Sequence, residues 1–156
     1  MFDIDKRRYK EEVAMSRVQL ALNVENVDEA VGFYTKLFGA EPAKRRPGYA
    51  NFALTEPALK LVLIENPGHG GSLNHLGVEV GSTEEVTSAT RRLSDEGLET
   101  KEQNEVSCCY AVQNKVWVHD PSGAPWEVYT VLADAPQQDA SCCTGTEQAD
   151  GAACCA

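Results

Sequence analysis

The sequence predicts an α+β domain in which two βαβββ modules form one cupped mixed sheet. The first observation is a strand-like run that recurs after a shift of 56 residues, "VQLALNV" at 18–24 and "NHLGVEV" at 74–80. The second is that each run precedes a capping residue and an amphipathic helical stretch, 28–38 and 84–96, that ends at glycine. The third is that further strand-like runs follow each helix, so we infer an internal duplication.

The elements are expected in chain order. Asn26 and Asp28 mark the start of the first helix and Gly39 its end, while Ser82 and Thr83 precede the second helix and Gly97 follows it. Short runs bounded by turn residues predict the remaining strands. In the first half these are residues 48–54 and 58–65, and in the second half residues 108–113, 115–118 and 125–131.

A chain of 156 residues is expected to form one domain with its own core. Residues 1–14 are charged and are expected to be a flexible extension, with Met15 as an alternative start. Residues 15–132 hold the periodic apolar pattern, with modules at about 15–66 and 73–132. Residues 133–156 contain no Val, Ile, Leu, Met or aromatic residue. We therefore expect a disordered tail there.

Charge and composition exclude several partners. The net charge of −10 argues against nucleic acid, and no run of about 18 apolar residues predicts a membrane span. The charged start of the chain is unlike a secretory signal, so we expect a cytoplasmic protein. All six cysteines stand in adjacent pairs, and thiols in a reducing compartment more often serve metal binding or catalysis than disulfides.

The duplication points to candidate metal ligands. The 56-residue shift places Gln19 on His75, and overlaying the last strands places Lys60 on Glu127. An imidazole, a carboxylate and an amide oxygen form a variant of the facial triad of non-heme iron(II) oxygenases, which leaves positions open for dioxygen and substrate. A charged lysine cannot be a ligand. The pattern therefore favours Gln19, His75 and Glu127.

Other interpretations of the same residues stay open. Gln19 and His75 are also compatible with solvated strand positions, and Glu127 with an ion pair to Lys60. His69, in a glycine-rich loop, and His119, in a turn, are weaker candidates for the metal.

The segment "HDPSGAPWEVY" (119–129) resembles the closing turn and strand of the vicinal oxygen chelate superfamily, as does the region around the first helix. A closer resemblance is to the organoarsenical carbon–arsenic lyases and the related cadmium-inducible proteins. It rests on six segments spread over about residues 15–134: "SRVQLALNV", "PGYANFAL", "LKLVLIENPG", "LNHLGVEV", "CCYAVQNKVWV" and "PWEVYTVLAD".

The resemblance implies a non-heme Fe(II)-dependent dioxygenase that cleaves the carbon–arsenic bond of trivalent methyl- or aryl-arsenicals and releases arsenite. It places the iron ligands on Gln19, His75 and Glu127, and the substrate-binding pair on Cys108 and Cys109. Dioxygen would be the co-substrate. Residues 1–14 have no counterpart in the resemblance.

Adjacent thiols suit this chemistry, because two thiolates can replace both oxygen ligands of a trivalent organoarsenical and the second bond forms intramolecularly. Successive strand residues point to opposite faces, so we expect Cys108 and Cys109 at a loop–strand junction. The alternative is a buried pair of small, inert side chains. In a regular strand, Lys115 would lie on the same face as Cys109. The favoured interpretation of Lys115 is a solvated surface lysine, and the alternative is a side chain that covers the site.

Two further functions are alternatives: a non-catalytic protein that sequesters arsenite or cadmium through its cysteine pairs, and another enzyme of the superfamily such as a glyoxalase. The glyoxalase is disfavoured because the residues supply three candidate ligands and no fourth carboxylate. Four points stay open. They are the choice between methyl- and aryl-arsenicals, the choice between monomer and homodimer, the starting methionine, and the role of the tail pairs Cys142/Cys143 and Cys154/Cys155.

Overall fold

The computed structural model describes residues 16–108 and 110–135. The first half of this part contains β1 (Arg17–Val24), α2 (Val27–Phe38), β2 (Lys44–Arg46), β3 (Tyr49–Thr55) and β4 (Ala58–Glu65). The second half contains β5 (Leu73–Glu79), α3 (Thr83–Asp95), β6 (Lys101–Cys108), β7 (Ala111–His119) and β8 (Pro125–Asp134). The order strand, helix and three strands occurs twice, as the sequence predicts.

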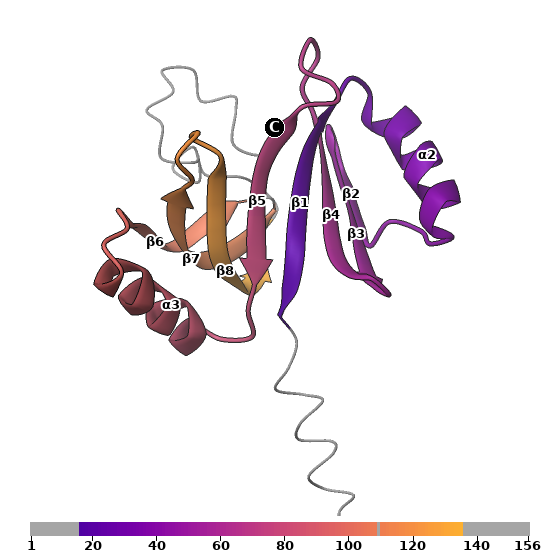
Figure 1. The fold of residues 1–156 in the computed structure, drawn as a ribbon. Helices are drawn as coiled ribbons and strands as arrows, with labels where there is room; N and C mark the ends of the chain where they lie inside the picture. The colour runs from indigo at the N-terminus through magenta and orange to yellow at the C-terminus, as the bar shows by residue number, and fades with distance from the viewer. Residues whose placement is uncertain (1–15, 109, 136–156) are drawn as a thin grey trace, which may run out of the picture.

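The strands described form one 8-stranded mixed sheet in the order β2-β3-β4-β1-β5-β8-β7-β6. The two modules meet through the antiparallel pair β1–β5, and within each module the first strand runs parallel to the last. Figure 1 shows β1 and β5 side by side in the middle, with α2 and α3 on the outer sides of the two halves. This α+β arrangement is the curled sheet of the vicinal oxygen chelate fold, so the predicted fold class is confirmed.

The strand register tests the proposed equivalence of the modules. Leu20 pairs with Leu76, and on either side of this pair Gln19 faces Gly77 and Ala21 faces His75. A two-fold relation through the central pair therefore makes Gln19 equivalent to His75, as the 56-residue shift predicts.

The equivalence of Lys60 and Glu127 is wrong. Ala21 pairs with Val62, and Gly77, its equivalent in the second module, pairs with Glu127. Val62 thus corresponds to Glu127, and Lys60 lies one pleat further along β4. The overlay from sequence was two residues out of register because the short last strands share little beyond their apolar pattern.

Both helices begin at caps that the sequence identified, and α2 also ends at the predicted Gly39, whereas the C-cap of α3 is Glu96, one residue before Gly97. The side chain of Asn26 accepts a hydrogen bond from the Glu29 N–H at 2.9 Å, and that of Ser82 accepts one from the Glu85 N–H at 3.3 Å. Gly39 ends α2 in the left-handed conformation, with φ of 63°, where a Cβ is unfavourable. No helix in the described residues is long and apolar enough to cross a bilayer.

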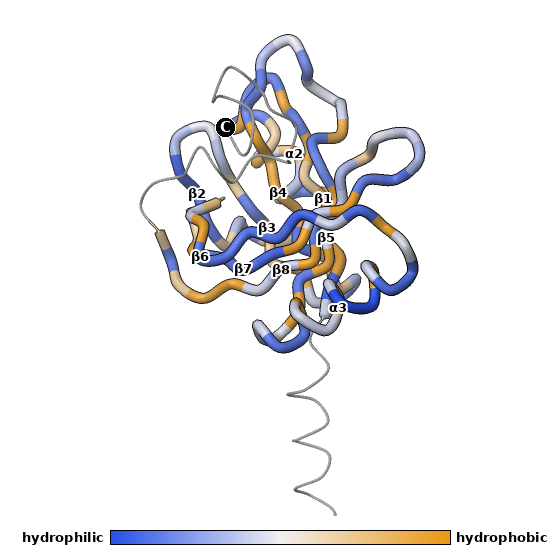
Figure 2. Tube along the Cα trace, turned by 90° about the vertical axis from the view of Figure 1, so that its left-hand side faces the viewer, coloured by the Kyte–Doolittle hydropathy of each residue, from blue (hydrophilic) through white to orange (hydrophobic). Residues whose placement is uncertain are grey.

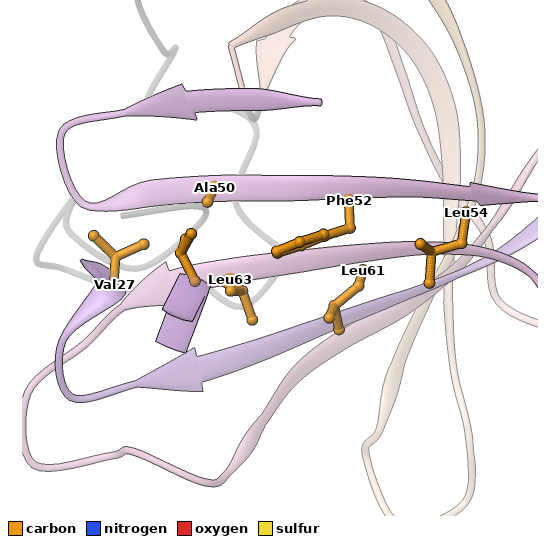
Figure 3. Close-up of a cluster of buried hydrophobic side chains, with 7 residues drawn as sticks. Val27, Ala50, Phe52, Leu54, Leu61 and Leu63 are labelled. Carbon is orange, nitrogen blue, oxygen red and sulfur yellow. The ribbon is translucent and has the colours of Figure 1, made fainter. Parts of the chain in front are cut away.

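Each helix covers the outer, convex face of its half of the sheet. Under α2 lies a cluster of buried side chains to which β3 contributes Phe52 and Leu54 and β4 contributes Leu61 and Leu63 (Figure 3). A smaller cluster under α3 includes Val86 and joins it to Val116 of β7. Because side chains alternate along a strand, the residues between these positions point to the inner, concave face.

The two ends of the sheet approach each other. The ammonium group of Lys44 in β2 donates to the main-chain oxygen of Tyr110 at 3.0 Å and forms an ion pair with Asp134. The rings of Tyr49 and Tyr110 pack with centroids 5.3 Å apart. In the view of Figure 2, the two edge strands β2 and β6 lie on the same side of the molecule. These contacts enclose the inner face.

The structure adds two strands that the sequence pattern did not predict. β2 is only three residues long, and β6 is an exposed edge strand, "KEQNEVSC", with little apolar alternation. The expected strands 108–113 and 115–118 are the single strand β7. β8 continues to Asp134, so residues 133–135, assigned to the tail from sequence, belong to the fold. The extension 1–14 and residues 136–156 lie outside the described residues.

The glycines of α2 provide a test of this description. Gly32 is exposed in the helix interior and no atom lies within 4 Å of the position its Cβ would take. We expect Gly32→Ala to raise the free energy of unfolding by about 0.5–1 kcal/mol. Gly39→Ala should lower it by about 1 kcal/mol, because alanine is strained at positive φ. Urea unfolding measures both, and equal effects would contradict the assigned end of α2.

Candidate metal and thiol site

Three adjacent strands bring the predicted metal ligands together on the inner face. Gln19 lies on β1, His75 on β5 and Glu127 on β8. Their exposed fractions are 2%, 1% and 1%. The alternatives of a solvated Gln19 and a surface His75 are therefore wrong.

The polar ends of these side chains converge. Gln19 Nε2 lies 3.0 Å from His75 Nε2 and donates to Glu127 Oε1 at 2.8 Å. His75 Nε2 and Glu127 Oε1 are 3.5 Å apart. On its other side, Gln19 accepts a hydrogen bond through Oε1 from the Tyr129 hydroxyl at 2.6 Å.

Neighbouring residues orient the imidazole. His75 Nδ1 lies 2.7 Å from Asn74 Oδ1, and because an amide oxygen only accepts, Nδ1 carries the proton. The Nε2 lone pair then points toward Gln19 and Glu127. The Trp117 ring packs edge-on against the imidazole, with centroids 5.5 Å apart. Metal-binding histidines commonly have such an acceptor on the other ring nitrogen.

Glu127 forms a buried ion pair with Lys115. Lys115 Nζ donates to Glu127 Oε2 at 2.6 Å, and Lys115 is 0% exposed. Burial acts to raise the pKa of Glu127, but the charge of Lys115 and the contact with His75 hold that pKa well below its ordinary value. The carboxylate is thus ionised, with Oε1 directed to the other two candidates. The interpretations of Lys115 as a solvated residue and of Lys60 as the partner of Glu127 are both wrong.

A glycine makes room for this carboxylate. Gly77 stands between Gln19 and Glu127 in the register. A Cβ at this position would lie 3.0 Å from Glu127 Cγ and 3.3 Å from the Tyr129 ring. The glycine is required here for the close approach of these side chains, not for its backbone conformation.

Lys60 lies on the same face but outside the cluster. Its ammonium group is 5.2 Å from the centroid of the Tyr129 ring. Burial lowers the pKa of Lys60, and the nearby Glu79 partly offsets this effect. With valine at the position equivalent to Glu127, β4 supplies no fourth oxygen or nitrogen ligand there.

The donor set fits a divalent metal of the iron type. Among the described residues no group of three His, Cys, Asp or Glu side chains could hold a metal ion, so the candidate site depends on the amide of Gln19. As placed, its nitrogen faces the other two ligands. The reversed amide would present Oε1 to them, and the Tyr129 hydroxyl can either donate or accept. One amide oxygen, one imidazole and one carboxylate then suit Fe(II) with positions left open.

Cys108 also lies on the inner face, as the last residue of β6 rather than near the start of a strand. It is 1% exposed and packs with Ala21, Tyr49, Val62 and Ile64. Tyr110, with φ of 59°, turns the chain into β7, so Cys108 stands at a loop–strand junction as expected. The burial of Cys108 is compatible with both earlier interpretations, a small inert side chain and a substrate-binding thiol. Cys109 and the four tail cysteines lie outside the described residues.

Sequence reasoning missed Tyr129 and Asn74, which orient two of the candidate ligands. Tyr129 follows Glu127 by two residues, so strand alternation places it on the same face and was a usable signal. Asn74 is adjacent to His75 in the chain, and no spacing rule indicates its contact. His69 and His119 are both exposed, away from the cluster.

Residues 16–128 match the model of the Glyoxalase/Bleomycin resistance protein/Dioxygenase superfamily. The chain belongs to this superfamily. It is 55% identical over 151 residues to a protein of Thermomonospora curvata named trivalent organoarsenical cleaving enzyme, covering 90% of this chain and 100% of the relative. It is 62% identical over 121 residues to the cadmium-induced protein CadI of Mycobacterium tuberculosis, covering 78% of this chain and 80% of the relative.

Solved structures of the superfamily share the fold. Homoprotocatechuate 2,3-dioxygenase from Arthrobacter globiformis superimposes with a TM-score of 0.57 at 20% identity. The match covers 77% of this chain and 37% of the dioxygenase. At this identity the likeness supports the arrangement of the modules and not a shared substrate.

The buried ion pair gives a test of the site's electrostatics. Lys115→Met would leave the Glu127 carboxylate buried without its cation, so the metal-free protein should lose about 3–5 kcal/mol of unfolding free energy in urea. Lys101→Met, at an exposed position of β6, should change it by less than about 0.5 kcal/mol. Similar effects of the two substitutions would contradict the assigned ion pair.

Proposed function

We propose that this protein is an Fe(II)-dependent dioxygenase that cleaves the carbon–arsenic bond of trivalent methyl- or aryl-arsenicals and releases arsenite. The observation that carries the proposal is a single enclosed inner face. One imidazole, one carboxylate and one amide converge on it, and a cysteine of an adjacent pair lies on the same face. The names of the relatives support the choice of substrate. A cytoplasmic location follows as part of the proposal.

Gln19, His75 and Glu127 would hold the metal. Bound Fe(II) would supply the activation of dioxygen, the co-substrate, for oxidative cleavage. Lys115 keeps one oxygen of Glu127 occupied, so the carboxylate offers the other oxygen to the cluster. Asn74 holds the proton of His75 on Nδ1 and leaves Nε2 available.

Cys108 and its neighbour Cys109 would hold the arsenical. A methylarsenic(III) species with two hydroxyl ligands reacts with two thiols to form two As–S bonds and two water molecules, and the As–C bond remains. Because the second thiol is adjacent in the chain, the second exchange is intramolecular. Positioning the As–C bond on the inner face next to the metal would be the protein's contribution to the rate.

The activity itself is the first test. The chain, freed of metal and reconstituted with Fe(II), should convert methylarsenite to arsenite in air. Omission of either Fe(II) or oxygen should abolish product formation. The alternative, a protein that sequesters arsenite or cadmium, has its support in the six paired cysteines and predicts stoichiometric binding that is independent of both.

Substitution of the candidate ligands tests their assignment. His75→Ala and Glu127→Ala should abolish iron retention and turnover. Gln19→Ala should weaken iron binding less, because a neutral amide is the weakest of the three donors. Iron content after desalting measures the effect. Stoichiometric iron in the His75 variant would exclude it as a ligand.

Substitution of the cysteines should separate arsenical cleavage from iron binding. Cys108→Ser and Cys109→Ser should each eliminate cleavage of methylarsenite and leave the iron content unchanged. Serine preserves the size of the side chain but binds trivalent arsenic poorly. Loss of iron from these variants would mean that the thiols are metal ligands, contrary to the proposal.

A further inference from the structure

Gln113 presents an unsatisfied acceptor beside Cys108. Its side chain is 2% exposed on the inner face of β7, and its Nε2 donates to the main-chain oxygen of Cys108 at 2.8 Å. Only the amide nitrogen can donate to a carbonyl, so this contact fixes the amide orientation. Oε1 then points away from Cys108 O and is buried without a hydrogen-bond partner among the described residues.

A buried acceptor without a partner is unfavourable, and such groups in native structures commonly have a functional explanation. The Gln113 amide is neutral and of fixed orientation, so the partner that Oε1 lacks is a donor, that is, an O–H or N–H group.

The position along β7 indicates where that ligand lies. Alternate residues of the strand face inward. Ala111 pairs with Cys108, Lys115 binds Glu127, and Trp117 contacts His75. Gln113 stands between Ala111 and Lys115, about 7 Å along the strand from each. Along β7 it therefore lies between the residue that pairs with Cys108 and the residue that binds Glu127.

We propose that Gln113 Oε1 accepts a hydrogen bond from a hydroxyl group on thiol-bound arsenic. This inference rests on the proposed function, because it takes Cys108 and Cys109 as the arsenic ligands. Gln113 would be a positioning residue that also recognises the hydroxyl, since its nitrogen holds the main-chain oxygen of Cys108.

The chemistry makes this subsite selective. Arsenous acid, As(OH)₃, exchanges two hydroxyls for two thiolates with release of two waters and keeps one As–OH group. Methylarsonous acid exchanges both of its hydroxyls in the same way and keeps only the As–CH₃ group. The acceptor therefore finds a donor in the bound inorganic product and none in the fully bound methylated substrate. Gln113 should favour binding of arsenite over methylarsenite.

The test measures dissociation constants for arsenite and methylarsenite without oxygen, so that no turnover occurs. The parent is the full chain with the tail residues Cys142, Cys143, Cys154 and Cys155 replaced by serine, which leaves one thiol pair. Gln113→Met should weaken arsenite binding about fivefold, the value of one hydrogen bond, and change methylarsenite binding by less than about twofold.

Asn114→Met is the matched control. Asn114 is the next residue and is also buried, but its side chain points away from the inner face and binds Thr83 and the Glu105 N–H. It should leave the ratio of the two dissociation constants unchanged. If Gln113→Met does not fold, Gln113→Asn shortens the amide and should shift the ratio in the same direction.

Equal weakening of both ligands by the Gln113 variant would show that the residue only positions the turn, and would overturn the inference. An unchanged ratio would overturn it as well. A parent that binds neither arsenical, or that binds both equally well after Cys108→Ser, would instead refute the proposed function.

Discussion

The ion pair between Glu127 and Lys115 is the interaction on which the inner face depends. A carboxylate enclosed between two halves of a sheet is unfavourable unless a cation compensates it. Lys115 compensates one oxygen and leaves the other directed at Gln19 and His75. Gly77 makes this possible, because any larger side chain would contact Glu127. The pair thus allows a carboxylate to stay ionised at a fully enclosed position.

The duplication explains the geometry of the cluster and also its asymmetry. The two-fold relation about Leu20 and Leu76 brings Gln19 and His75 to equivalent positions on adjacent strands. The last strand of each module lies next to the first, but only the second module supplies a carboxylate there. The first module has Val62 at that position, so the site has three candidate ligands and leaves coordination positions for other groups.

Much of this arrangement was predictable from sequence, for identifiable reasons. The period of the strands, the caps Asn26 and Ser82 and the 56-residue repeat are local signals, and they predicted the modules and the pair Gln19 and His75. The register of β4 and β8, the edge strands β2 and β6, and the partner of Glu127 depend on contacts between distant segments. The alternation of residues along β7 does not show whether Lys115 is buried or solvated.

The central claim is that metal and arsenic are held by separate groups of one enclosed face. X-ray absorption at the iron edge of the reconstituted protein tests it most directly. The account predicts a first shell of nitrogen and oxygen atoms only, unchanged by Cys108→Ser. A sulfur neighbour at about 2.3 Å, the range of metal–thiolate bonds, would contradict it, because the thiols would then belong to the metal site.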